Sequence, residues 1–203
     1  MNNYDEKKIE KVKEFIEDNI DQIENNQFEL LYGIAYTYLE GKTGIFTKVL
    51  NDAGIDPLPH LTEIPGYYLA WTDTKYFEIP NNVQLISEFA FAFTEIKTQL
   101  IPSNIKVISE DAFYACSKLQ EVEIEEGCEE IAKYAFDGCT KLRTIYLPKS
   151  IKLLGKGLFK YNPNLIISYA GTYEDWIMIN KDKDFTEKAI IRLIAKDMDR
   201  YIS

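Results

Sequence analysis

One stretch of the sequence occurs twice in succession, and this repetition limits what the chain can fold into more than any other feature. Residues 101–124 and 125–147 align with each other at a displacement of 23 residues. A unit of this length cannot bury its own apolar side, so successive units must stack and share one continuous core. The positions that agree are Ala112 with Ala135, Phe113 with Phe136, Cys116 with Cys139, Leu119 with Leu142, Val122 with Ile145, and Ile124 with Leu147.

The period of the repeat indicates the architecture. Units of about 20 to 29 residues that carry Leu, Ile and a Cys or Asn are typical of leucine-rich-repeat solenoids. We therefore predict an α+β fold, a leucine-rich-repeat solenoid of about five short rungs with parallel strands, capped by an N-terminal helical segment. Residues 1–63 are predicted to form the helical cap, and residues 64–203 the solenoid with its C-terminal cap.

Recurring Ile-Pro dipeptides mark the end of a short strand in each rung. The marks fall at Pro80, Pro102, Glu125, Pro148 and Gly171, which are 22, 23, 23 and 23 residues apart. Side chains alternate between the two faces of a strand, so the residues one and three positions before each mark are predicted to face the core. In the last rung these are Ala170 and Ser168. We also predict a buried stack of Phe91, Phe113, Phe136 and Phe159.

The residues two and four positions before each mark are predicted to face solvent and to form a protein-binding face. Tyrosine and aliphatic side chains alternate there with carboxylates, and tyrosine is enriched where proteins bind each other. Solenoids commonly bind partners through the face that their parallel strands line. The alternative is an ordinary solvated strand surface. The predicted face consists of Tyr76, Glu78, Thr98, Leu100, Glu121, Glu123, Thr144, Tyr146, Ile167 and Tyr169.

The N-terminal segment is predicted to be helical. Apolar residues at three-four spacing from Ile9 to Ile23 indicate an amphipathic helix, and further helices are predicted over residues 27–40 and 44–53. A row of carboxylates follows one position after the apolar row, which is either a solvated face or a second contact for a basic partner. The carboxylates are Glu10, Glu14, Glu17, Asp21 and Glu24.

Charge and hydropathy exclude several classes of function. The net charge of −10 opposes direct binding to nucleic acid, which needs a basic stripe for the phosphates. The sequence contains no long apolar run and no apolar segment near its start, so we expect a cytoplasmic protein that does not enter the membrane. Cys116 and Cys139 are predicted to stack as small buried thiols rather than to form a disulfide.

We find no catalytic constellation in the sequence, since no nucleophile stands beside a base. We therefore predict a non-enzymatic protein without a cofactor. The alternative is a metal-dependent protein that uses an acidic cluster, because hard cations bind carboxylates. The cluster lacks the Asp-x-Asp-Gly loop of a calcium site, which favours a solvated patch. It comprises Glu121, Glu123, Glu125, Glu126, Glu129 and Glu130.

The C-terminal region contains a helix start and an ambiguous tail. Residues 172–175, Thr-Tyr-Glu-Asp, are typical of a capping box, which would place Trp176 over the last rung. The pattern of residues 189–202 fits either a helix or a strand, and we favour a closing strand.

The repeated units resemble the BspA-type, or treponemal-type, leucine-rich repeats, over residues 64 to about 200. The GTYEDW sequence at residues 171–176 is similar to the ending of many such proteins, and residues 1–63 resemble short cytosolic repeat proteins of bacteria and their phages. Members of the family are mostly bacterial, often attached to the cell surface, and bind other proteins. The resemblance therefore implies a protein-interaction module. One version is an acidic inhibitor of a nucleic-acid-binding enzyme, such as an anti-CRISPR protein, and the alternative is a fragment of a surface adhesin.

Overall fold

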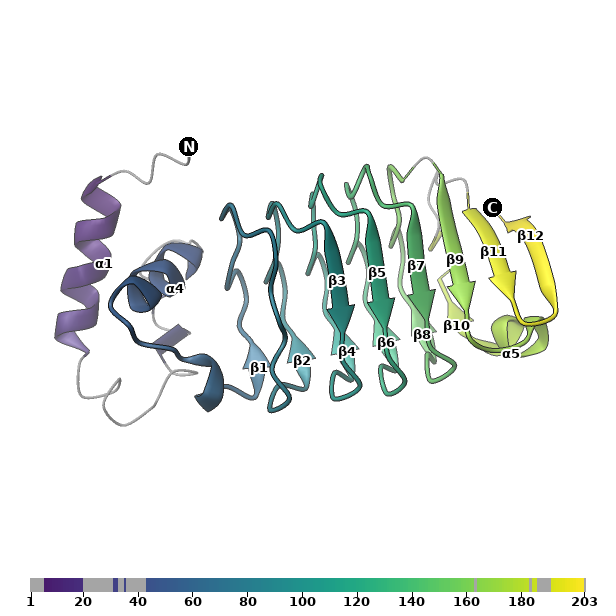
Figure 1. Cartoon of the computed structure of the whole chain (residues 1–203), viewed down its shortest axis with the longest axis horizontal. Helices are drawn as coiled ribbons and strands as arrows, with labels where there is room; N and C mark the ends of the chain where they lie inside the picture. Colours follow the sequence, from purple (N-terminus) through teal and green to yellow (C-terminus); the bar gives the residue numbers. More distant parts are fainter. Residues whose placement is uncertain are drawn as a thin grey trace.

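The chain forms a row of stacked rungs with helices at its N-terminal end and a β-hairpin with a short helix at its C-terminal end (Figure 1). The computed structural model describes residues 6–19, 31–32, 35, 43–162, 164–182, 184–185 and 191–202. This is the predicted leucine-rich-repeat solenoid of α+β class, with its helical segment at the first rung.

Short strands from the rungs form two six-stranded sheets, which run along opposite sides of the solenoid. The first rung has a strand in only one of the two sheets, and the last strand of the chain completes a hairpin. Sheet A is parallel and contains β1 (Glu63–Ile64), β2 (Leu85–Ile86), β4 (Val107–Ile108), β6 (Glu130–Ile131), β8 (Leu153–Leu154) and β10 (Asn180–Lys181). Sheet B contains β3 (Thr98–Ile101), β5 (Glu121–Ile124), β7 (Thr144–Leu147), β9 (Leu165–Tyr169), β11 (Ile191–Ala195) and β12 (Met198–Ile202). Among the strand pairs of the described residues, β11–β12 is antiparallel and the others are parallel.

The turn that follows the sheet A strand has positive φ at the same two positions in each of the first five rungs. Bulky side chains rarely adopt this conformation. The first position is occupied in successive rungs by Tyr67, Phe89, Asp111, Tyr134 and Gly157, and the second by Trp71, Phe93, Ala115, Gly138 and Tyr161.

A column of four phenylalanines forms the centre of the core, as the sequence predicts. The rings of Phe91, Phe113, Phe136 and Phe159 are fully buried and stacked, with successive centroids 4.9, 5.2 and 6.2 Å apart. Each aromatic ring buries a large apolar area, so this column is a major source of stability. Backbone hydrogen bonds also join successive rungs along this column: the Phe113 N–H donates to the Ala135 carbonyl over 2.8 Å.

The predicted cysteine column is also present, and its thiols are buried and reduced. The Cys116 thiol donates to the Phe91 carbonyl over 3.0 Å, and the Cys139 thiol donates to the Phe113 carbonyl over 3.1 Å. Each thiol therefore satisfies a buried backbone oxygen of the preceding rung, in addition to filling space in the core.

The N-terminal helices pack onto the first rung. Helix α1 (Glu6–Asp18) contacts α4 (Thr43–Asp52) through the rings of Phe15 and Phe46, whose centroids are 5.7 Å apart. The Tyr32 ring contacts both Phe46 and Tyr68, a core residue of the first rung. The predicted third helix is confirmed as α4. The ends of the first two predicted helices, including Ile20 and Ile23, lie outside the described residues.

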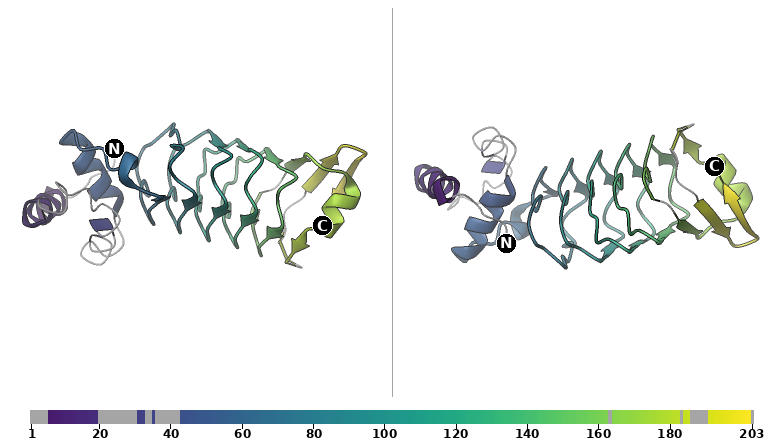
Figure 2. Two further views of the ribbon diagram at one scale, coloured as in Figure 1. Left: turned by 90° about the horizontal axis from the view of Figure 1, so that it is seen from below. Right: turned by 90° about the horizontal axis from the view of Figure 1, so that it is seen from above.

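The C-terminal end is closed by α5 (Tyr173–Met178) and the β11–β12 hairpin (Figure 2). The predicted capping box is confirmed: the Thr172 hydroxyl accepts from the Asp175 N–H, and the Asp175 carboxylate accepts from the Thr172 N–H over 2.9 Å. Trp176, the residue that follows the capping box in α5, is buried. The favoured closing strand is confirmed as β11, but β12 was not predicted.

Candidate protein-binding face

The outer face of sheet B carries the side chains that the sequence places on the binding face in the second, third and fourth rungs. The first-rung members, Tyr76 and Glu78, are exposed on a segment that precedes β3 in the chain and forms no strand. We call this set the outer strip. Cross-strand pairing aligns Leu100 with Glu123 and Glu123 with Tyr146. Strands β3, β5 and β7, which carry most of the strip, lie side by side in Figure 1. It comprises Tyr76, Glu78, Thr98, Leu100, Glu121, Glu123, Thr144 and Tyr146.

The prediction for the last rung is wrong by one residue. Ile167 and Tyr169, predicted to face solvent, are buried in the core, whereas Ser168 is half-exposed and Ala170 is exposed. In the sheet, Tyr146 pairs with Ser168, and Leu147 pairs with Tyr169. A shift of one residue turns every side chain of a strand to the other face. The observed register buries the larger apolar side chains, which removes more apolar area from water.

The outer strip combines exposed apolar side chains with carboxylates. Leu100 and Tyr146 remain 48% and 41% exposed although they lie within a paired sheet, and Tyr76 is more exposed still. Glu121 and Glu123 lie on the strand between them and form no ion pair within the described part of the chain. Nothing in the fold requires apolar side chains at these positions, because the opposite face of each strand already supplies the core.

A cavity of about 350 Å³ borders the outer strip on the side where the strands begin. Arg143 and Gln120 immediately precede strands β7 and β5, and Lys141 adds a second cation. This feature was not predicted from the sequence, although Gln120 and Arg143 occupy equivalent positions once the rungs are aligned. The lining residues are Gln120, Thr140, Lys141, Leu142, Arg143 and Asn164.

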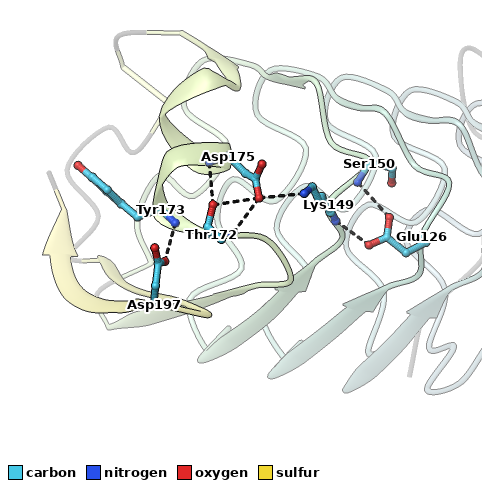
Figure 3. A network of polar contacts seen from close by, with 7 residues as sticks. All are labelled: Glu126, Lys149, Ser150, Thr172, Tyr173, Asp175 and Asp197. Carbon is cyan, nitrogen blue, oxygen red and sulfur yellow. Dashed lines mark hydrogen bonds and ion pairs between the residues drawn. The ribbon is translucent and has the colours of Figure 1, made fainter.

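The acidic cluster of the sequence is divided among different surfaces. Glu121 and Glu123 belong to the outer strip, whereas the Glu126 carboxylate accepts from the N–H groups of Lys149 and Ser150 over 2.8 and 3.0 Å (Figure 3). The Glu129 carboxylate forms a 2.6 Å ion pair with the Lys152 ammonium, and their hydrogen bond lowers the pKa of Glu129.

The two remaining members of the acidic cluster lie elsewhere again. Glu125 accepts from the Ser103 N–H over 2.9 Å, and Glu130 lies on sheet A. Within the described residues, no group of three or more His, Cys, Asp or Glu side chains is arranged to hold a metal ion. The cluster therefore does not form the single site that the metal-dependent alternative requires.

The polar contacts at the C-terminal cap are structural. The Lys149 ammonium forms a 3.1 Å ion pair with the Asp175 carboxylate, and the Tyr173 N–H donates to Asp197 (Figure 3). Hydrogen bonds from the Thr172 backbone and from Lys149 lower the pKa of Asp175. This network joins α5 to the solenoid and to the hairpin, so we assign it no binding role.

The predicted second contact lies on α1, at the opposite end of the molecule from the hairpin (Figure 1). Glu10, Glu14 and Glu17 are exposed on this helix, and Glu10 is 3.6 Å from the Lys13 ammonium. Asp21 and Glu24 lie outside the described residues. A contact through α1 remains a prediction.

Comparison with known families identifies the repeats. Six copies of the BspA type leucine rich repeat region match residues 55–168. The chain belongs to the BspA-type leucine-rich repeat family. Leucine-rich repeats are in general protein-interaction modules, and this membership supports that broad role for the present chain. No curated protein matches the sequence.

Two solved structures are similar to part of this BspA-type chain. A leucine rich cell surface protein from Faecalibacterium prausnitzii A2-165 is 26% identical, with a TM-score of 0.44 over 55% of this chain and 36% of that one. A leucine-rich repeat protein from Bacteroides ovatus ATCC 8483 is 19% identical, with a TM-score of 0.37 over 58% of this chain and 38% of that one. The chain thus spans little more than a third of either protein. Among the described residues, none of the helices is both long and apolar enough to span a membrane.

Proposed function

We propose that this BspA-type protein is a non-enzymatic binding module that holds a protein partner on its outer strip. The observation that carries the proposal is the exposure of Leu100 and Tyr146 on either side of Glu123, on neighbouring paired strands of sheet B. Tyrosine provides a large contact area with little loss of conformational entropy on binding, and a hydrogen-bonded sheet holds the backbone beneath it in place.

The charge of the chain favours a basic partner. The net charge is −10, and Glu121 and Glu123 add two carboxylates to the strip itself. Complementary charge speeds association and excludes partners of the same sign. We therefore include in the proposal a cytoplasmic inhibitor that occupies the basic groove of a nucleic-acid-binding enzyme.

Site-specific cross-linking in the source cell tests where the partner binds. A photoreactive phenylalanine placed at position 146 should capture the partner. The same group at position 161 is the matched control, because Tyr161 is 58% exposed but lies on a turn outside sheet B. Capture at position 161 and not at position 146 would contradict the proposal.

Affinity measurements with the purified partner then test the energetics. Tyr146→Ala and Leu100→Ala should each weaken binding by about 1 to 3 kcal/mol, without lowering the melting temperature. Tyr161→Ala should leave the affinity unchanged. Glu121→Lys combined with Glu123→Lys should slow association most strongly at low salt. If these changes have no effect while charge reversal at Glu10, Glu14 and Glu17 abolishes binding, helix α1 and not the outer strip carries the function.

A further inference from the structure

Five aromatic side chains form a second surface feature on the turns of the first three rungs. We call them the aromatic cluster: Tyr67, Trp71, Phe89, Phe93 and Tyr114. The Tyr67 ring is stacked on Phe89 with centroids 4.9 Å apart, and Trp71 is stacked on Phe93 at 5.3 Å. Tyr114 meets Phe89 and Phe93 edge-on, at 6.1 and 5.4 Å. The cluster lies on the turns that follow the sheet A strands in the chain, and none of its residues belongs to the outer strip.

The fold does not require aromatic side chains at these positions. Tyr67, Trp71, Phe89 and Phe93 all have φ between 56° and 61°, a conformation that is unfavourable for bulky residues. At the same two turn positions the later rungs carry Ala115, Gly138 and Gly157 as well as Asp111, Tyr134 and Tyr161, so the turn does not depend on an aromatic residue. What sets the first rungs apart is that their aromatic residues occur together on adjacent rungs and stack on one another.

The cluster is open to solvent and lies in an acidic part of the chain. Trp71 and Phe93 are 40% and 41% exposed. Residues 66–95 contain four carboxylates and a single cation, Lys75. Glu88 directly precedes Phe89, and its carbonyl accepts from the Tyr67 N–H over 3.2 Å. The carboxylates of Asp73, Glu88 and Glu95 are exposed and form no ion pair within the described residues.

We propose that the aromatic cluster, with Asp73, Glu88 and Glu95 beside it, binds an arginine-rich segment of a protein partner. A guanidinium group stacks on aromatic rings and pairs with carboxylates, so it uses both features of this surface. Lysine has the same charge but is a strongly hydrated point charge, and it stacks less well. A neutral sugar could pack on the rings and donate its hydroxyl groups to the carboxylates, but it would not neutralise their charge. The combination of rings and acids without ion-pair partners in the described residues therefore favours arginine.

Peptide binding to the whole protein tests this assignment. The probes are two fluorescein-labelled peptides of the same length, one with four arginines separated by glycines and one with four lysines. The arginine peptide should bind at least about threefold more tightly at low salt, as expected for stacking at an exposed site. An unlabelled arginine peptide should also change the tryptophan emission of the wild-type protein. That signal reports Trp71, because the only other tryptophan, Trp176, is buried.

Matched variants separate stacking from charge. Trp71→Gly combined with Phe93→Gly should remove the preference for arginine, and glycine suits the backbone there, as Gly138 shows. Tyr161→Gly is the control, because it changes an exposed aromatic residue at the same backbone position outside the cluster. Glu88→Gln combined with Glu95→Gln should weaken both peptides but keep the preference.

Three results would overturn the proposal. The first is equal affinity for both peptides with unchanged Trp71 emission in the wild type, which would mean attraction by net charge only. The second is absence of binding by either peptide at low salt. The third is a response of Trp71 to a neutral oligosaccharide such as cellohexaose and not to the peptides, which would indicate a carbohydrate site. Because the outer strip is intact in every variant, these results are independent of the test for the proposed function.

Discussion

The ring of Tyr169 packs edge-on against the indole of Trp176, with centroids 5.5 Å apart and an angle of 64° between the planes. Tyr169 lies on β9, and Trp176 lies on the capping helix α5. Gly171 leaves room for this arrangement, since a Cβ there would be 2.6 Å from the Tyr169 ring. The contact joins the core of the repeats to their C-terminal cap.

Replacing Trp176 should therefore destabilise the whole solenoid. We expect Trp176→Ala to lower the free energy of unfolding by about 3 to 5 kcal/mol, because the cavity it leaves adds to the lost burial. Met178→Ala, on the exposed side of the same helix, should change it by less than about 0.5 kcal/mol. Urea denaturation measures both, and equal effects would show that α5 does not close the core.

The phenylalanine column offers a test with the same residue type in two environments. Phe113 is fully buried, so Phe113→Ala should cost about 3 to 5 kcal/mol. Phe93 is partly exposed and has positive φ, so Phe93→Ala should cost much less in the same urea denaturation experiment. A cost below about 1 kcal/mol at Phe113 would contradict the stacking of the rungs.

Asp111 should make stability depend on pH. Burial raises the pKa of Asp111 to about 6 from an ordinary value of 3.8, with Glu110, Asp137 and Glu88 raising it further and Lys133 opposing them. Between these two pKa values the Asp111 carboxyl group is more ionised in the unfolded chain than in the folded one. The free energy of unfolding of the wild type therefore falls as the pH rises from about 4 to 6. The Asp111 side chain is partly exposed to water, which limits the loss to about 1 kcal/mol.

The variant Asp111→Asn isolates this effect, since asparagine does not titrate and tolerates positive φ. Relative to the wild type, its free energy of unfolding should rise by about 1 kcal/mol between pH 4 and pH 7. Urea titrations at the two pH values measure the difference. A constant difference would show that the carboxyl group is not perturbed.

Glu126 should stabilise the protein without any metal. Its carboxylate accepts two backbone N–H groups of the next rung, so Glu126→Ala should cost about 1 to 2 kcal/mol. Glu121→Ala, on the outer strip, should have almost no effect on stability. Addition of EDTA should leave the melting temperature of the wild type unchanged, and a fall would support the metal-dependent alternative.

The sequence predicts those parts of the fold in which one residue type recurs at a fixed spacing. Phe113 and Phe136 could be placed because a 23-residue period repeats the same local environment, and Thr172 because a capping box is a local motif. The register of β9 could not be placed, because the spacing shortens by one residue after Leu165 and no Pro marks the strand end. Comparing which face buries more apolar area would have assigned Ile167 and Tyr169 to the core.

The aromatic cluster escaped the sequence analysis for a different reason. Strand alternation describes only the residues near the Ile-Pro marks, whereas Trp71 and Phe93 stand on turns whose shape depends on positive φ. Their contact joins residues 22 positions apart, and it appears only when the rungs are stacked. The same holds for the cavity beside Arg143, where Gln120 and Asn164 come from the two neighbouring rungs.

The thiol of Cys139 is bonded to the carbonyl of Phe113 in the rung before it, just as Cys116 is bonded to Phe91. The rung of Cys116 thus carries both a thiol donor for the rung before it and, at Phe113, the acceptor for the rung after it. A duplication or deletion of one complete unit, such as residues 110–132, would keep every such bond paired. The surface that this protein presents can therefore lengthen or shorten during evolution in steps of about 4.8 Å, the spacing of adjacent strands, while the insertion of a single residue within a strand would turn its core side chains to the solvent face.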